Sequence, residues 1–150
     1  MSIDYIVASL PSLRFDEPPA LDWTRFAAQL PEGFELEIER AFGDLDTQLR
    51  NAIAEARGGE KYCRSAVGCS LFWKARVLAA MQEKDVMKRE MALDRVRWDA
   101  AGELTDIASP LGKGALMTYA LRLKIALKRA KISTQKGNEA FDRLTAETRI

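Results

Sequence analysis

Apolar residues recur every three or four positions along most of the chain, which is the period of an α-helix with one buried face. The clearest stretch covers residues 34–57. Its apolar stripe consists of Phe34, Ile38, Phe42, Leu45, Leu49, Ala52, Ile53 and Ala56. Glutamates fill the first turns, Arg57 lies in the last turn, and Gly58 and Gly59 provide a stop, in accord with the helix dipole. The pattern predicts an amphipathic helix over 34–57.

Residues 65–107 contain no proline and keep a helical period throughout. One long helix would satisfy this pattern, and so would two helices with a bend near residues 82–85. A second apolar stripe, formed by Met87, Met91 and Trp98, makes the later part apolar on more than one side. We therefore expect this part to be flanked by two neighbouring helices or by a partner.

The C-terminal third begins with a loop at 106–114, which contains Pro110 and two glycines, and continues as a basic helix expected over 113–132. The buried stripe of that helix would be Leu116, Tyr119, Ala120, Leu123, Leu127 and Ala130. The opposite arc carries Arg122, Lys124, Lys128 and Lys131, and it also carries Leu121 and Ile125, which we expect to be exposed. A separate short helix is expected over 138–148.

Prolines at positions 11, 18 and 19 interrupt the first 20 residues and predict an extended, partly packed arm there. Asp22 is placed to cap a short helix that ends at Pro31. The whole chain is thus predicted to be one all-α domain. It would combine an extended, proline-containing N-terminal arm over 1–20 with a helical bundle of about four to six helices over 21–150.

The longest apolar stripes are expected to cover one another and form the core. On the first predicted helix these residues are Phe42, Leu45, Leu49 and Ile53. The residues expected to face them are Leu71, Leu78 and Leu123. A stripe that remained uncovered would have to face a partner.

Composition agrees with one globular domain, because 150 residues with 47% apolar and 30% charged side chains suffice for a single core. The start lacks a basic region and a long apolar run, and no segment approaches the ~20 apolar residues of a membrane span. Two cysteines cannot form a disulfide framework. These features indicate a cytoplasmic protein that meets a membrane only through partners.

Charge is distributed unevenly along the chain despite a net charge of +1. Residues 1–60 hold 5 basic and 12 acidic residues, and residues 61–150 hold 18 basic and 10 acidic, which gives −7 and +8. Such a dipole favours contact between the halves or docking on charged protein surfaces. The lysines of the basic helix are interpreted as a solvated face and not as a nucleic-acid site, because no recognition motif accompanies them.

Candidate chemistry is sparse. The chain has no histidine, which excludes catalytic triads and Cys-His nucleophiles, and it has no phosphate-loop spacing. Cys63 and Cys69 lie beside cationic residues that could activate a thiol, but two small helix-packing residues are the simpler interpretation. The carboxylates Glu90, Asp94, Asp99 and Glu103 alternate with arginines and are interpreted as a solvated ion-pair surface. No catalytic residue, cofactor or metal is predicted.

Four segments carry a resemblance to a known family. They are Tyr5-Ile6-Val7-Ala8-Ser9-Leu10-Pro11 with Phe15-Asp16-Glu17-Pro18-Pro19, then Leu49-Arg50-Asn51-Ala52, then Ala92-Leu93-Asp94-Arg95-Val96-Arg97-Trp98-Asp99 with Glu103-Leu104-Thr105, and finally Leu116-Met117-Thr118-Tyr119-Ala120-Leu121-Arg122-Leu123-Lys124. In this order, across most of the chain, they resemble an uncharacterised bacterial family encoded among V-type ATP synthase subunits. That family looks like a diverged, short relative of the C-type (also called d-type) socket of the V-type ATPase, the all-helical component that joins the rotor's central stalk to its membrane ring.

The resemblance implies a non-catalytic subunit, or an assembly or coupling factor, of a bacterial V-type ATPase. Its partners would be stalk or membrane-sector subunits, which would attach it peripherally to the inner membrane. The expected contact surface is formed by Leu121, Arg122, Ile125 and Lys128. The alternatives are a free-standing helical adaptor or regulator and, third, an enzyme that uses Cys63 or Cys69.

Overall fold

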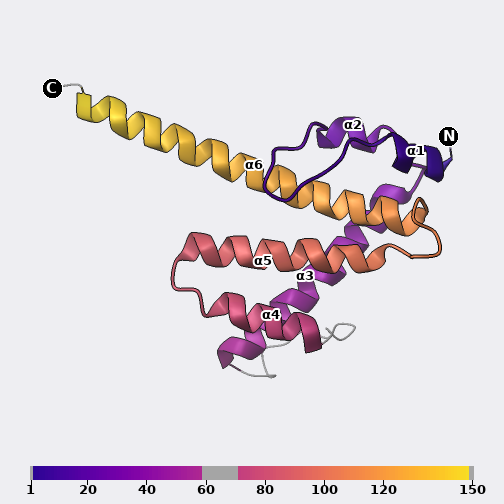
Figure 1. Ribbon diagram of the computed structural model, residues 1–150, viewed down its shortest axis with the longest axis horizontal. Helices are drawn as coiled ribbons and strands as arrows, with labels where there is room; N and C mark the ends of the chain where they lie inside the picture. Colours follow the sequence, from indigo (N-terminus) through magenta and orange to yellow (C-terminus); the bar gives the residue numbers. More distant parts are fainter. Residues whose placement is uncertain (1, 59–70, 149–150) are drawn as a thin grey trace.

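The computed structural model describes residues 2–58 and 71–148, and all regular structure within them is helical (Figure 1). The helices are α1 (Ile3–Ser9), α2 (Trp23–Ala27), α3 (Phe34–Gly58), α4 (Leu71–Met81), α5 (Val86–Ala101), the 3₁₀ helix η2 (Gly102–Leu104) and α6 (Lys113–Thr148). The all-α fold predicted from the apolar periods is therefore confirmed. Both cysteines lie outside the described residues.

The N-terminal arm begins as a helix, and the prediction that residues 1–20 are extended is wrong there. The Ser2 hydroxyl accepts a hydrogen bond from the Tyr5 N–H at 3.4 Å and caps α1, and Asp4 lies in the first turn. The first proline follows only at Pro11, after the helix has ended. Residues 10–21 are non-helical, as predicted, and run back across α6 to α2 (Figure 1).

The periods of the central helices were predicted correctly. Helix α3 begins at Phe34 and ends at Gly58. Of the two alternatives for residues 65–107, the described part, from 71 onward, adopts two helices. Asp85 separates α4 from α5 because its carboxylate accepts hydrogen bonds from the N–H groups of Met87 and Lys88 and so caps a new helix.

Helix α6 is a single helix of 36 residues, and the prediction of a separate helix over 138–148 is wrong. No proline lies within it, and the poorest helix former between 132 and 138 is Gly137. One glycine costs a helix only ~1 kcal/mol, which does not suffice to end it. At 1.5 Å per residue α6 is about 54 Å long, and its C-terminal end extends past all other helices (Figure 1).

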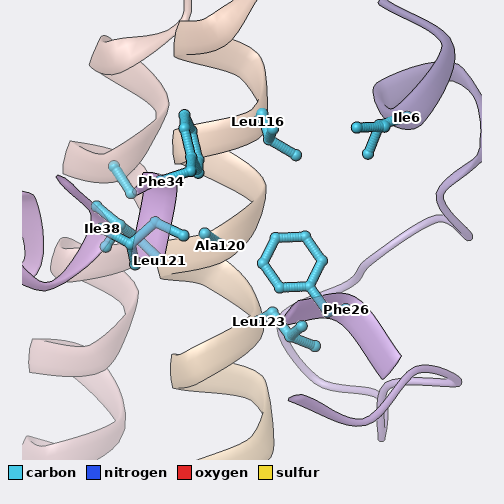
Figure 2. Packing of buried hydrophobic residues seen from close by; sticks show 9 residues of the cluster. Ile6, Phe26, Phe34, Ile38, Leu116, Ala120, Leu121 and Leu123 are labelled. Carbon is cyan, nitrogen blue, oxygen red and sulfur yellow. The ribbon is translucent and has the colours of Figure 1, made fainter. Parts of the chain in front are cut away.

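The first half of α6 lies at the centre of the main core, shown in Figure 2. Ile6 of α1 and Phe26 of α2 approach it from one side, and Phe34 and Ile38 of α3 approach it from the other. The α6 residues in this cluster are Leu116, Ala120, Leu121 and Leu123. Because neighbours cover α6 on several sides, its buried surface is much wider than a single stripe.

A second core cluster joins α3, α4 and α5 and corrects the predicted partners of the α3 stripe. Leu49 is buried and Ile53 packs beside it, as expected, but they meet Trp73 and Val77 of α4. Leu78 is 48% exposed, so its predicted core position is wrong. The side chain of Leu71 lies outside the described residues. Phe42, Leu45 and Leu123 share the main cluster, as predicted.

Truncation of Leu49 tests the second cluster. Leu49 is 2% exposed, and Leu49→Ala should lower the free energy of unfolding by roughly 2–5 kcal/mol through lost burial and a residual cavity. The matched control, Leu78→Ala on α4, should cost less than about 1 kcal/mol because half of that side chain already meets solvent. Urea titrations of the two variants measure the difference. Equal losses would contradict the observed register of α4.

Candidate partner-binding groove between α5 and α6

The four residues predicted to contact a partner do not form one surface. Leu121 is fully buried and Ile125 is 3% exposed, so the expectation that they are exposed is wrong. Leu121 belongs to the main core, and Ile125 packs with Trp98 and Ala126. Helices α3 and α5 cover the arc of α6 that the sequence left free, and both residues are core.

Arg122 is half-buried and fastens α6 to the end of α5. Its Nε donates a hydrogen bond to the Trp98 carbonyl oxygen at 3.0 Å, and its guanidinium carbon lies 5.2 Å from the Trp98 ring centroid. Burial lowers the pKa of Arg122, and Arg95 lowers it further, while the Asp99 carboxylate opposes both effects. Arg122 therefore contributes to packing and not to a docking surface.

Tyr119, one turn earlier on α6, fastens the N-terminal segment. Its hydroxyl donates a hydrogen bond to the Pro11 carbonyl oxygen at 2.8 Å. Burial raises the pKa of this phenol, so the hydroxyl keeps its proton and remains a donor at neutral pH. The contact holds residues 10–21 against α6.

Lys128 is the one residue of the predicted four that reaches a free surface, because 52% of its side chain is exposed. Its Nζ lies 3.2 Å from Oδ1 of Asp94 on α5. The ion pair places Lys128 at the point where α6 leaves the bundle. This part of the prediction identifies the surface described next.

Asp94 is the charged centre of that surface and is only 3% exposed. Its Oδ1 accepts a hydrogen bond from Arg97 Nη1 at 2.9 Å, and Arg129 Nη1 lies 3.5 Å from Oδ2. The Nε atom of Arg97 also lies 3.8 Å from Oδ1 of Asp46 on α3. One carboxylate thus connects α5 with α6 directly and with α3 through Arg97, and its three cations offset the cost of burying its charge.

The interpretation of the α5 carboxylates as a solvated surface is wrong for Asp94. The interpretation as a solvated ion pair agrees better with Asp99, which pairs with Arg95 at i,i+4 as expected. The Arg95 Nε atom lies 3.5 Å from Asp99 Oδ1. Asp99 also makes a shorter contact, 2.7 Å, with Arg76 of α4. Local sequence could not separate the two, because burial of Asp94 depends on the distant residues of α6.

A groove of about 400 Å³ lies between α5 and α6 beside Asp94. Helix α5 lines it with Met87, Lys88, Glu90, Met91 and Asp94, and α6 lines it with Lys128, Arg129, Ile132 and Ser133. Its apolar members are unusually open to solvent: Met87 is 41%, Met91 49% and Ile132 37% exposed. The groove therefore combines uncovered apolar side chains with cations, which is the composition of a binding surface.

The second apolar stripe of α5 was predicted to meet a second neighbour or a partner, and only one end of it is covered by a neighbour. Trp98 is buried against Phe15 of the N-terminal segment, with the ring centroids 5.6 Å apart. Met87 and Met91, farther toward the start of α5, stay exposed. The chain thus covers one end of the stripe and leaves the other open.

Other site types have little support in the described part of the chain. Among residues 2–58 and 71–148, no cluster of three or more metal-ligating side chains is present. No helix in the same ranges is both long and apolar enough to cross a membrane. The groove offers apolar contact and cationic donors, which suit binding of a protein segment.

The family model described as "Protein of unknown function (DUF2764)" matches residues 67–148, which is more than half of the chain. The chain belongs to the DUF2764 family. No curated protein and no solved structure matches it. The matched range contains α4, α5, η2 and α6, and it includes every residue that lines the groove. The part of the chain that matches the family model thus carries Asp94 and the projecting helix α6.

Neutralising Asp94 tests its structural role. Asp94→Asn should lower the free energy of unfolding by about 3 kcal/mol, because three cations would lose their buried counter-charge. Glu90→Gln, an exposed carboxylate on the same helix, is the matched control and should change it by less than about 0.5 kcal/mol. Thermal or urea unfolding at low and high salt measures both, and the Asp94 loss should persist in salt. An Asp94→Asn variant as stable as Glu90→Gln would contradict the role.

Proposed function

We propose that this DUF2764 protein is a non-catalytic subunit, or an assembly or coupling factor, of a bacterial V-type ATPase, and that it acts by protein–protein contact. The observation that carries the proposal is the projection of α6 beyond the bundle (Figure 1). Every described side chain of α6 after Ala130 is exposed. A helix that extends about 27 Å past its own core gains most of its stability from packing on another surface.

The V-type ATPase enters the proposal through the sequence resemblance. The third segment of the resemblance, from Ala92 to Asp99, falls in α5, and the segment from Leu116 to Lys124 falls in the buried half of α6. Both contribute to the scaffold that directs the projecting helix. The partners would be stalk or membrane-sector subunits, so the chain would reside in the cytoplasm and reach the inner membrane only through them.

Binding fits the available chemistry better than catalysis does. The chain has no histidine to act as a base near neutral pH, and Cys63 and Cys69 have no histidine to activate them. The groove presents flexible methionines beside cations, which favour recognition of another protein. A helical adaptor unrelated to the ATPase is the competing function.

A pull-down from the native organism tests the proposal. The affinity-tagged chain should recover stalk or membrane-sector subunits at low and moderate salt. A chain ended after Ser133 keeps the buried half of α6 and the groove, so it should melt as the full chain does but recover much less of these subunits. Recovery of other proteins but no ATPase subunit at either salt concentration would favour the adaptor function. Equal recovery by the shortened chain would exclude the projecting helix as the contact.

A further inference from the structure

The groove between α5 and α6 combines exposed apolar side chains with lysines on its two rims. We infer that it binds an acidic amphipathic helix of a partner protein, whose apolar side chains lie between the methionines of α5 and Ile132. Its carboxylates would meet Lys88 and Lys128 on the two rims. The inference deepens the proposed function and rests on it only for the assembly that supplies the partner.

The shape of the groove suits the face of a helix. Met87 and Met91 are one helical turn apart on α5, and Ile132 faces the same space from α6. A space of about 400 Å³ is at the small end of the roughly 300–1,000 Å³ typical of ligand sites. Methionine has an unbranched, adaptable side chain, so two of them can fit apolar anchors spaced at i and i+3 or i+4.

The charge of the groove favours an acidic partner. Its lining has three cations, Lys88, Lys128 and Arg129, against two carboxylates, Glu90 and Asp94, which leaves +1. Asp94 is shared by Arg97, Arg129 and Lys128, so it offsets only part of the charge of Lys128. Lys88 is exposed, and 52% of the Lys128 side chain is exposed. Carboxylates placed against these two ammonium groups would steer association and fix its register.

A second copy of the chain fits less well than a different protein. One acidic surface among the described residues is the start of α3, where Leu36 is 53% exposed and Glu32, Glu35 and Glu39 lie beside it. Docking that surface into the groove would join two different faces. In a dimer joined by such a heterologous contact, one groove and one acidic face stay unoccupied. Further copies would then add head to tail, unless the rotation between neighbouring copies closes a ring.

A membrane surface also fits less well. Apolar anchoring in a bilayer needs side chains that project from a convex face into the headgroup region. Met87, Met91 and Ile132 instead line a hollow between two helices. An inserted side chain from a protein fills such a hollow, whereas a flat lipid surface leaves it empty.

Methionine methyl NMR of the full chain tests the inference, since the five methionines include two in the groove and the partly buried Met81 and Met117 outside it. The probes are two synthetic peptides of about 18 residues, long enough to form helices. Both carry leucines at i, i+4 and i+7, flanked by glutamates in one and by lysines in the other. The glutamate peptide should shift the methyl signals of Met87 and Met91 and leave Met81 and Met117 unchanged. The lysine peptide should shift none.

Two variants separate the groove from general attraction of charge. Lys88→Glu should weaken binding of the glutamate peptide about tenfold, because a rim ammonium becomes a carboxylate. Lys84→Glu makes the same charge change at an exposed residue in the turn between α4 and α5, outside the groove, and should leave the dissociation constant within about twofold. Met91→Ser removes an apolar wall and should weaken binding without affecting the fold.

Four results would overturn the inference. The first is equal methyl shifts with both peptides, and the second is no shift at Met87 and Met91. The third is that the Lys84 and Lys88 variants weaken peptide binding equally. The fourth is that phosphatidylserine vesicles, or self-association of the chain, shift the methyl signals of the groove. The pull-down separates this inference from the proposed function. ATPase subunits recovered equally by the Lys88→Glu chain would remove the groove as the contact and keep the function. Selective peptide binding without recovery of any ATPase subunit would keep the groove and remove the function.

Discussion

The burial of the first half of α6 on several sides is the constraint on which the rest of the structure depends. Helices α1 and α2 cover one side of it and α3 and α5 cover others, so all four elements lose apolar contacts if it moves. Its start is fixed by close packing, because a Cβ at Gly114 would overlap the Leu104 carbonyl oxygen. Thr118 donates a hydrogen bond to the Ala101 carbonyl oxygen at 2.8 Å and therefore accepts the one from Thr105. These contacts fix both the position and the direction of α6.

The second half of the same helix continues in that direction, and its described side chains are exposed. Asp94 lies near the transition, and its ion pairs with Lys128 and Arg129 hold α6 to α5 where the buried part of α6 ends. Beyond this point the two helices present the groove. A packed base therefore carries an exposed helix and an open apolar hollow, and the proposed role in protein–protein contact rests on these two features.

Sequence periodicity predicted the all-α fold and α3, because both depend on local residue spacing. It left one long helix or two helices open for residues 65–107, and the cap at Asp85 decides for two. It failed where distant residues decide the outcome. Leu121 and Ile125 share an arc of α6 with lysines, and only the tertiary positions of α3 and α5 show that this arc is covered. The sequence indicated part of the groove, because Met87 and Met91 belong to a second apolar stripe that one buried helix face does not need. Burial of Asp94 had no sequence signal, because its cations come mainly from another helix.

Hydrogen exchange along α6 in the isolated chain tests most directly whether one helix serves as both core and projecting arm. Amides of residues 116–126 should exchange only through global unfolding, because buried side chains surround them. Amides after Ile132 should exchange orders of magnitude faster, since a helical end that projects from its core is marginally stable. A steep change in protection near residues 130–132 is the predicted result. Uniform protection over the whole of 113–148, or an unprotected segment at 116–126, would contradict the account.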